Sequence, residues 1–257
     1  QDEKRERLRF AGEDAKAVSE FFAAQAGKGL FREVHAKVLL DAQADLVSMK
    51  SAFGSFFNDA RPDDFAVIFF AGHGVMNKGF GYIMAQNSLY DDPYPTAYRM
   101  SEFQEALADI IPTRNTLAFL DACHSGVAGT PRRLMAQAGE EGPRTGLRGD
   151  DDTERFNDAL STLAGKTTGR AVLTASRNRE FSAEDSAKRH GVFTYYLLEA
   201  LQGAADGVQN GEKDGKVTIG EMYDYLFDKV KSDTKGDQHP HVSGDYDNNW
   251  PLAVVPK

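Results

Sequence analysis

The stretch DFAVIFFAGHG, residues 64–74, is an unbroken apolar run that ends in Gly-His-Gly. A run without polar residues at alternate positions is typical of a strand that is buried on both faces, as in a parallel sheet. A second run, NTLAFLDACHSG at 115–126, ends in small and polar residues, and GRAVLTAS at 169–176 is a third. The three runs predict the centre of an open parallel sheet.

Helical periodicity appears around these strands. Residues 8–26 place Phe10, Val18 and Phe22, with Ala17 and Phe21, on one face of a helix. Strands that alternate with helices predict an α/β fold with a mostly parallel central sheet and helices on both faces. Further helices are predicted at 43–59, 101–111, 191–203 and 218–232, a short strand at 34–40 and a last edge strand at 251–255.

Residues 129–168 differ in composition from the rest of the chain. They are rich in Gly, Arg, Asp and Thr and poor in aromatic residues. A connection of this length within a compact domain is usually functional or disordered. The sequence therefore predicts one domain over residues 1–257, interrupted by a long exposed loop at 129–168.

The overall charge and the single cysteine exclude several classes of protein. A formal net charge of −9 argues against nucleic acid or an anionic membrane as the main partner. No uninterrupted apolar stretch reaches transmembrane length, and the start QDEKRERLRF is not a signal peptide. One cysteine cannot form an internal disulfide, which favours a reducing compartment such as the cytoplasm. The missing initial Met predicts a fragment or a processed product.

Two of the predicted buried strands end in reactive side chains, His73 and Cys123. Sites in open parallel sheets form at the carboxyl ends of strands, so these residues are expected to face each other. A nearby imidazole increases the thiolate fraction of a cysteine and can later protonate the leaving amine. The N–H groups of Gly74 and Cys123 are candidates for stabilising an oxyanion.

Other roles for Cys123 and His73 are a buried core thiol, a structural histidine or a metal ligand. A single cysteine with scattered histidines matches no zinc spacing, so we predict no metal at this site. The joint occurrence of the two residues at glycine-flanked strand ends, roughly 50 residues apart, favours a nucleophile and its base.

The motifs AGHG at 71–74 and DACHSG at 121–126 resemble the caspase–metacaspase clan, and more closely its bacterial metacaspase-like members, often called orthocaspases. AGEDAKAVSEFF, TASRNREFSAE and HGVFTYYLLEAL are further similarities. The resemblance implies a caspase-like (caspase-hemoglobinase) fold and a cysteine endopeptidase with His73 and Cys123 as its dyad. It also implies a large-subunit-like part at about 1–130 and a small-subunit-like part at about 169–257.

The resemblance also bears on the substrate. Caspases commonly carry Gln two residues before the nucleophile and cleave after Asp, whereas metacaspases carry Asp there and cleave after Arg or Lys; this chain has Asp121. Asp14 matches the first-helix acidic residue that lines the metacaspase S1 pocket, where two carboxylates would hold a guanidinium. The other interpretation is a solvated Asp14 and a capping Asp121. Ser182 and Ala183 are candidates for contacts with the substrate backbone.

Two features depart from the family pattern. The family normally has a hydrophobic strand before the first helix, and metacaspases often carry Ser where this chain has Ala71. No cofactor is required for the predicted chemistry. Many metacaspases bind calcium near the active site, where Asp91 and Asp92 could contribute, while DGKVTIGEM at 214–222 lacks the spacing of an EF-hand loop.

The sequence thus predicts a cysteine endopeptidase that cleaves protein or peptide substrates after Arg or Lys. A catalytically silent caspase-like scaffold or interaction domain is disfavoured because both dyad residues are present, and another thiol hydrolase would leave the two aspartates unexplained. A monomer is favoured, since many metacaspases are monomeric. The 129–168 segment is a candidate for self-cleavage after Arg132, Arg133, Arg144, Arg148 or Arg155.

Overall fold

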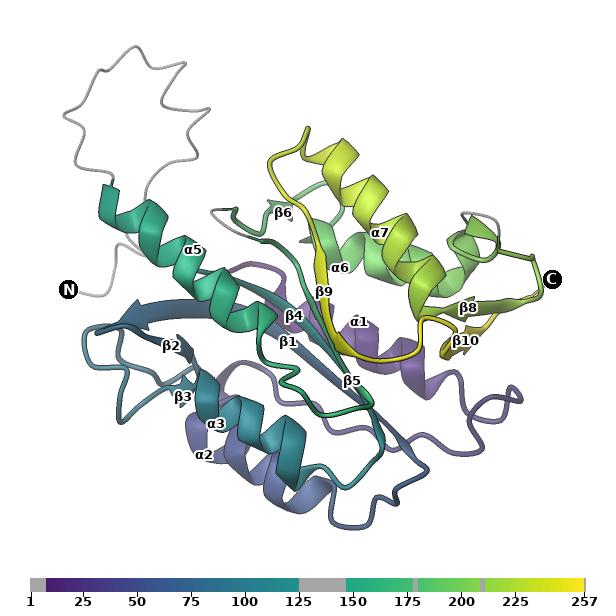
Figure 1. Ribbon diagram of the computed structural model, residues 1–257, viewed down its shortest axis with the longest axis horizontal. Coiled ribbons are helices and arrows are strands. Elements are labelled where there is room, and N and C mark those ends of the chain that lie inside the picture. The colour runs from purple at the N-terminus through teal and green to yellow at the C-terminus, as the bar shows by residue number, and fades with distance from the viewer. Residues whose placement is uncertain (1–7, 125–146, 178–179, 209–210, 257) are drawn as a thin grey trace.

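The computed structural model describes residues 8–124, 147–177, 180–208 and 211–256 (Figure 1). In this part of the chain the central sheet has six strands in the order β3-β2-β1-β4-β5-β9. The three middle strands are parallel and the outer ones antiparallel, which confirms the predicted α/β sheet and its three central strands. Two of the three are buried as predicted, whereas the first, Phe65–Asn77, is half-buried over most of its length. The strands are β1 (Phe65–Asn77), β2 (Phe80–Ile83), β3 (Tyr98–Arg99), β4 (Asn115–His124), β5 (Arg170–Thr174) and β9 (His241–Asp245).

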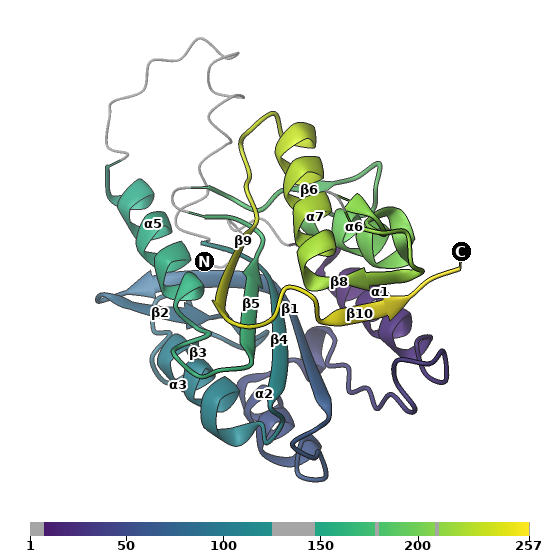
Figure 2. The same cartoon turned by 45° about the vertical axis from the view of Figure 1, so that its right-hand side comes forward.

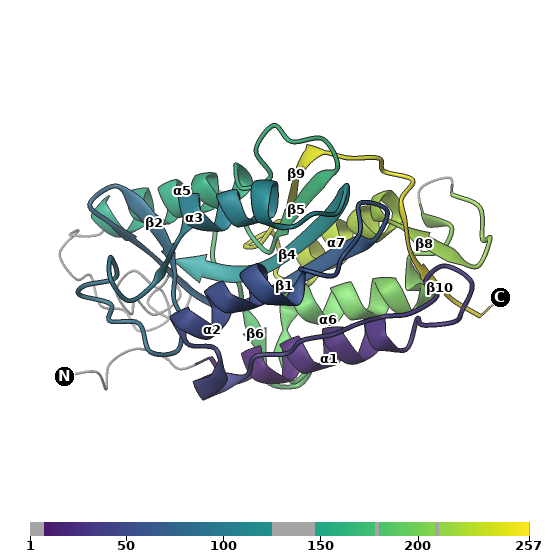
Figure 3. The same cartoon turned by 90° about the horizontal axis from the view of Figure 1, so that it is seen from below.

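The helices agree with the five predicted ranges, and three of them continue into a π-helical turn. Figure 3 shows α3 and α5 on one side of the sheet and α1 and α6 on the other. The helices are α1 (Ala11–Ala23), α2 (Leu46–Ser51, then Ala52–Phe56), α3 (Met100–Glu105, then Ala106–Ile110), α5 (Leu147–Ser161), α6 (Val192–Glu199, then Ala200–Ala204) and α7 (Ile219–Asp233), with a short 3-10 turn at Asp41–Gln43.

Coverage of both faces explains the unbroken apolar runs. In β4, Leu117 and Phe119 join the core beneath α1, α6 and α7, whereas Ala118 and Leu120 join the core beneath α2, α3 and α5. All four residues are fully buried. A strand with helices on both faces has no position that favours a polar side chain, and this is why the hydrophobic pattern located these strands correctly.

The predicted strand at 34–40 is wrong. The chain has no sheet partner there in the described part of the protein, and a strand exists only where a neighbour accepts and donates its backbone hydrogen bonds. The neighbouring edge of the sheet is also open: between Phe65 and His73, β1 pairs with β4 alone among the described residues, and β2 joins only from Gly74 to Asn77.

The predicted edge strand at 251–255 forms, but it does not belong to the central sheet. β10 (Pro251–Val254) pairs with β8 (Lys216–Thr218) in a separate two-stranded sheet, which lies beside α1 in Figure 2. A further small pair is formed by β6 (Glu184–Asp185) and β7 (His190–Gly191). Spacing along the chain indicates that a strand forms, but only the three-dimensional structure decides its partner.

The predicted exposed loop at 129–168 is wrong over its second half. Helix α5 occupies Leu147–Ser161, and Phe156 and Leu160 are both 0% exposed. The charged run GDDDTE precedes these residues and dominates the composition of the segment. The apolar residues that follow it at helical spacing were therefore not recognised as the buried face of a helix. Residues 125–146, which hold Arg132, Arg133 and Arg144, lie outside the described residues.

Arg170 at the start of β5 is a buried charged residue, only 5% exposed. Its guanidinium donates hydrogen bonds to backbone oxygens at the end of the α3 segment and in the loop after it, at 2.7 Å to Leu107, 2.8 Å to Thr113 and 3.0 Å to Arg114. Carbonyl groups after a helix lack intrahelical partners, and a cation is favoured near them. Arg170 therefore joins the helix end to the sheet.

We expect Arg170→Met to destabilise the fold by at least about 3 kcal/mol, because several buried carbonyl groups lose their donor. Urea unfolding measures the change. Arg114→Ala is the matched control: its side chain is 73% exposed and its ion pair with Asp63 lies at the surface, so a loss of less than about 1 kcal/mol is expected. Equal losses in the two variants would contradict this role of Arg170.

Candidate active site

His73 and Cys123 lie next to each other at the carboxyl ends of β1 and β4. The parallel register pairs His73 with Cys123 and Gly74 with His124. Paired strands are separated by about 4.8 Å, so the two residues are placed in adjacent positions, as the sequence predicted. The side chains of Cys123 and His124 lie outside the described part, and the catalytic roles stay predictions.

The end of β1 is closely packed around His73. The imidazole is half-buried, its ring centroid lies 6.3 Å from that of Tyr90, and the His73 carbonyl accepts a hydrogen bond from the Met84 N–H at 2.9 Å. At Gly74, a Cβ atom would lie 1.7 Å from the Phe156 ring. Only glycine fits there, so the helix that the sequence hid, α5, directly supports the strand end that carries His73.

Asp14 and Asp121 come together at Gly191. Asp14 lies on the buried face of α1 with Val18 and is 2% exposed, while Asp121 in β4 is 8% exposed. A Cβ atom on Gly191 would lie 2.6 Å from Asp121 Oδ2 and 3.2 Å from Asp14 Oδ2. Asp14 is therefore not a solvated helix residue, and the two buried carboxylates meet at Gly191, with Asp121 two residues before Cys123 in β4.

Each of the two carboxylates is held by its own set of donors. Asp121 accepts hydrogen bonds from Ser182 Oγ at 2.5 Å and from Thr194 Oγ1 at 2.7 Å. Asp14 accepts one from the Gly191 N–H at 3.0 Å, and its other oxygen lies 2.5 Å from His190 Nδ1. Both side chains are thus fixed in orientation before any ligand binds.

Burial raises the pKa of both aspartates. For Asp14, loss of solvent raises the pKa to about 6; the hydrogen bonds from Gly191 and His190 oppose this effect, and the charge of Asp121 adds to it. Burial likewise raises the pKa of Asp121 against the bonds from Ser182 and Thr194. Two neighbouring anions that lack solvent are unfavourable, and a cation placed between them would relieve the cost of keeping both charged.

Ser182 and Ala183 lie beside this pair, but the groups with which they would bind a substrate already form hydrogen bonds within the protein. The Ser182 hydroxyl donates to Asp121. The Ala183 N–H donates to Gln238 Oε1 at 3.0 Å, and its carbonyl accepts from the Val192 N–H at 2.8 Å. A substrate that used the Ala183 backbone would have to replace these bonds, so the predicted contact would require a rearrangement.

Sequence reasoning missed Thr194, Gly191, His190 and Glu184 as parts of the site. The Glu184 carboxylate accepts hydrogen bonds from the backbone N–H groups of Arg9 and Phe10, at 2.9 and 3.0 Å, and so ties the start of α1 to β6. Thr194 could have been found because it is a polar residue inside the apolar stretch HGVFTYYLLEAL. Asp14 is likewise a polar residue at an apolar position, since it lies four residues before Val18 on the buried face of α1.

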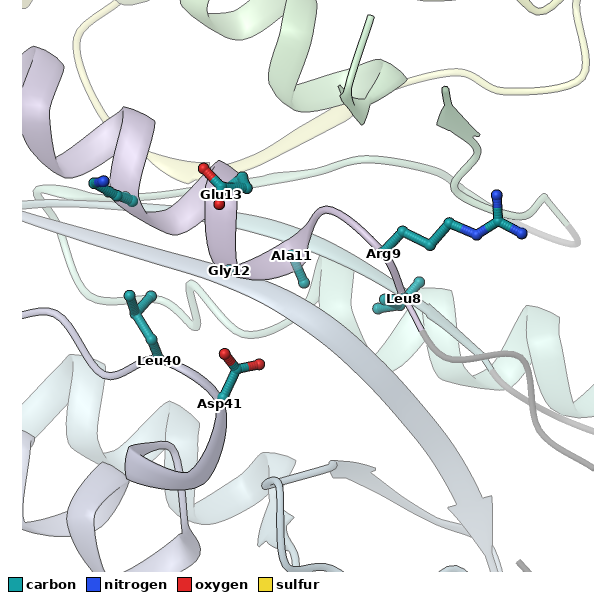
Figure 4. Close-up of a pocket in the computed structure, with 8 residues that line it drawn as sticks. Leu8, Arg9, Ala11, Gly12, Glu13, Leu40 and Asp41 are labelled. Carbon is teal, nitrogen blue, oxygen red and sulfur yellow. The ribbon is translucent and has the colours of Figure 1, made fainter. Parts of the chain in front are cut away.

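A pocket of about 610 Å³ lies at the N-terminal end of α1 (Figure 4). Glu13 and Asp41 each contribute a carboxylate to its lining, and Arg9 also lines it while its backbone N–H donates to Glu184. Because Glu13 directly precedes Asp14 in the sequence, the pocket lining is next to the carboxylate pair along α1. Neither Asp14 nor Asp121 lines the pocket. Its lining residues are Leu8, Arg9, Ala11, Gly12, Glu13, Lys16, Leu40 and Asp41.

The two candidate calcium positions differ in structure. Asp91 and Asp92 lie in a turn after β2. Residues 214–222 form the junction of β8 and α7, where Thr218 and Glu221 cap the helix reciprocally. Among the side chains that the structure describes, which leave out those of Cys123, His124 and residues 147–150, no three from His, Cys, Asp or Glu gather as a metal site would require. Within residues 8–124, 147–177, 180–208 and 211–256, no helix combines the length and the apolar character needed to cross a bilayer.

The fold and the paired strand ends define an α/β protein with a cysteine and a histidine at the carboxyl edge of its sheet. The family model of the caspase domain matches residues 3–247, so the chain belongs to the caspase family and is a caspase-type cysteine peptidase domain. Among curated proteins no sequence matches it.

Two solved structures share the fold. One is protein GSU0716 from Geobacter sulfurreducens, with a TM-score of 0.57 and 17% identity, covering 97% of this chain and 91% of that one. The other is caspase-1 from Spodoptera frugiperda, with a TM-score of 0.55 and 15% identity, covering 98% and 84%. The predicted caspase-like fold is thereby confirmed.

Proposed function

We propose that this domain is an endopeptidase of the bacterial metacaspase-like (orthocaspase) type that cleaves after Arg or Lys. The observation that carries the proposal is the convergence of Asp14 and Asp121 on Gly191, beside the strand end of Cys123. Both carboxylates are buried and oriented, and a guanidinium or ammonium group is the complementary ligand. An aspartate side chain would add a third negative charge to the same place.

In the proposed reaction, His73 takes the proton of the Cys123 thiol and the thiolate attacks the carbonyl carbon of the scissile bond. The negative charge that develops on the carbonyl oxygen is stabilised by the N–H groups of Gly74 and Cys123. The His73 imidazolium then donates its proton to the leaving amine, and water hydrolyses the acyl-enzyme. The adjacent backbone positions of His73 and Cys123 support this pairing.

Reporter peptides that differ only in the residue before the scissile bond test the proposal. We compare Arg, Lys and Asp at that position, with the parent protein and with Cys123→Ala. Turnover of the Arg and Lys peptides by the parent alone is the expected result. Turnover of the Asp peptide in preference to the Arg peptide would overturn the specificity, and equal turnover by Cys123→Ala would overturn the peptidase assignment.

We also expect self-cleavage between β4 and β5. The connecting segment offers the residue type that the carboxylate pair is proposed to accept, at Arg132, Arg133 and Arg144. Arg148 and Arg155 were also predicted as cleavage sites, but both lie within α5 (Leu147–Ser161), and Arg155 is next to the fully buried Phe156. A peptidase needs an extended substrate, so cleavage there would require α5 to unfold.

Intact-mass measurement of the parent beside Cys123→Ala tests this prediction. Cleavage after one or more of Arg132, Arg133 and Arg144, and none after Arg148 or Arg155, is expected in the parent. The two fragments should co-purify, because β4 and β5 pair in parallel from Thr116 to Leu120 on either side of the cut. Identical masses after long incubation would remove the self-cleavage and leave the peptidase proposal intact.

A further inference from the structure

His190 has a place at the carboxylate pair that the peptidase chemistry does not use. It lies in β7, directly before Gly191, and its Nδ1 atom is 2.5 Å from Asp14 Oδ1. Its side chain is 23% exposed, whereas that of Asp14 is 3% exposed. The imidazole therefore stands between a buried carboxylate and solvent, in contact with one of the two groups that are proposed to bind the substrate.

We propose that His190 is a positioning residue that orients Asp14 and sets the pH range over which a basic side chain binds to the Asp14–Asp121 pair. The inference rests on the proposed Arg/Lys specificity. A neutral imidazole with its proton on Nδ1 donates to Asp14 and leaves the carboxylate anionic. A protonated imidazole keeps the bond but places a positive charge where the substrate's own cation must bind.

The other charged and polar side chains near His190 interact with partners of their own, so the pH dependence of binding is assigned to His190 and Asp14. Lys188 is neutralised by Asp185 at 2.8 Å and Asp233 at 3.0 Å. The Tyr195 hydroxyl donates to Glu199, although its ring lies 6.5 Å from the imidazole. Histidine is the side chain that ordinarily changes charge between pH 5 and 8. His190 contacts Asp14, lies opposite Asp185 of β6 and has the Tyr195 ring nearby. Asp121 and Glu184 lie next to the adjacent Gly191, and Lys188 lies over the Tyr195 ring.

A change in pH should therefore act on substrate binding more than on the chemical step. Acidification protonates Asp14, because burial raises its pKa to about 6. That proton removes a negative charge from the site that a basic residue would occupy. Histidine is the side chain that ordinarily gains a positive charge in this range, and such a charge beside Asp14 would oppose a basic residue further. KM for an Arg peptide should therefore rise on acidification, and we propose that His190 contributes to the rise.

His190→Asn separates hydrogen bonding from titration, because its amide nitrogen takes the position of Nδ1 and carries no charge. We expect its KM at pH 8 to stay within about threefold of the parent, since one neutral donor replaces another. Below pH 6 the slope of log KM against pH should be smaller by about one proton. His190→Ala loses the donor and should raise KM about tenfold or more at pH 8, with kcat little changed.

The experiment measures kcat and KM for the Arg reporter peptide from pH 5 to 8.5 in the parent, His190→Asn and His190→Ala. His35→Asn is the matched control, since that histidine is 79% exposed and pairs only with Glu33 among the described contacts. A parental KM slope in His190→Asn would overturn the role of His190 and leave the specificity standing. A parent that does not cleave after Arg or Lys would overturn the proposed function first, and the inference with it.

Folding of the variants is checked by thermal unfolding, and a second measurement does not depend on turnover. The NMR titration of the His190 ring in Cys123→Ala should move when Asp14 is replaced by Asn, because the two groups share one contact. If Asp14→Asn leaves the NMR titration of the His190 ring unchanged, the proposal is contradicted, even where the His190 variants have no activity to measure.

Discussion

Cys123→Ala and His73→Ala are each expected to abolish peptide hydrolysis, with kcat lowered by at least about 10⁴-fold. The two residues hold adjacent positions at the ends of β1 and β4, and neither the thiolate nor its proton acceptor has a substitute at that register. Because the pair acts as one unit, the double variant should be little worse than either single variant. Reporter-peptide kinetics measure all three.

The fold should survive these substitutions. His73 is only half-buried, and the strands that carry both residues are held by a ten-pair parallel ladder from Phe65–Asn115 to Gly74–His124. We expect a single cooperative unfolding transition in each variant. His35→Ala, an exposed histidine far along the chain, should retain parental activity. Parental turnover in either dyad variant would remove the assignment.

Asp14→Asn and Asp121→Asn are expected to lower kcat/KM for Arg peptides by about 10²–10³-fold, mainly through KM. Loss of one partner from a buried ionic interaction costs about 3–5 kcal/mol, which is the size expected here when the substrate's cation faces a single carboxylate. Glu13→Gln is the matched control, because this exposed neighbour of Asp14 on α1 takes no part in the pair. An equal loss in Glu13→Gln would indicate a general charge effect.

Asp14→Asn should also make the fold more stable at neutral and alkaline pH. The pKa of Asp14 is raised from the ordinary 3.8 to about 6 in the folded protein, so between these values the folded state binds a proton that the unfolded state has released. The free energy of unfolding therefore falls as pH rises through this window. The Asn variant lacks this fall, and above pH 7 we expect a gain of about 1–3 kcal/mol.

Urea unfolding at pH 4 and pH 8, on the Cys123→Ala background to prevent self-cleavage, measures the effect. The gain should appear at pH 8 and largely vanish at pH 4, where Asp14 of the parent is protonated in the folded state and about half protonated in the unfolded state. A loss of stability at pH 8 would mean that the carboxylate is stabilising in the unliganded protein, and it would contradict the view that the pair awaits a cation.

The sequence alone determined the strands of the sheet centre and the residues at their ends. β4 and β5 are buried on both faces and β1 is half-buried over most of its length, so the apolar runs of all three are continuous and needed no tertiary information to be recognised. His73 and Cys123 follow from these strands, because parallel neighbours end at the same edge of a sheet. The positions of the two proposed catalytic residues were thus predictable from local pattern and topology together.

Only the tertiary structure decided which residues surround the carboxylate pair. Asp14, Asp121 and His190 are far apart in the chain, and their contact depends on how α1 and α6 pack against β4, which no local period encodes. The same reason accounts for the errors. A strand at 34–40 requires a neighbour that the described sheet does not provide, and α5 becomes a helix because Phe156 finds a place beneath Gly74. Local sequence patterns report the faces that an element can bury, whereas the partner that buries them is set by packing between distant segments.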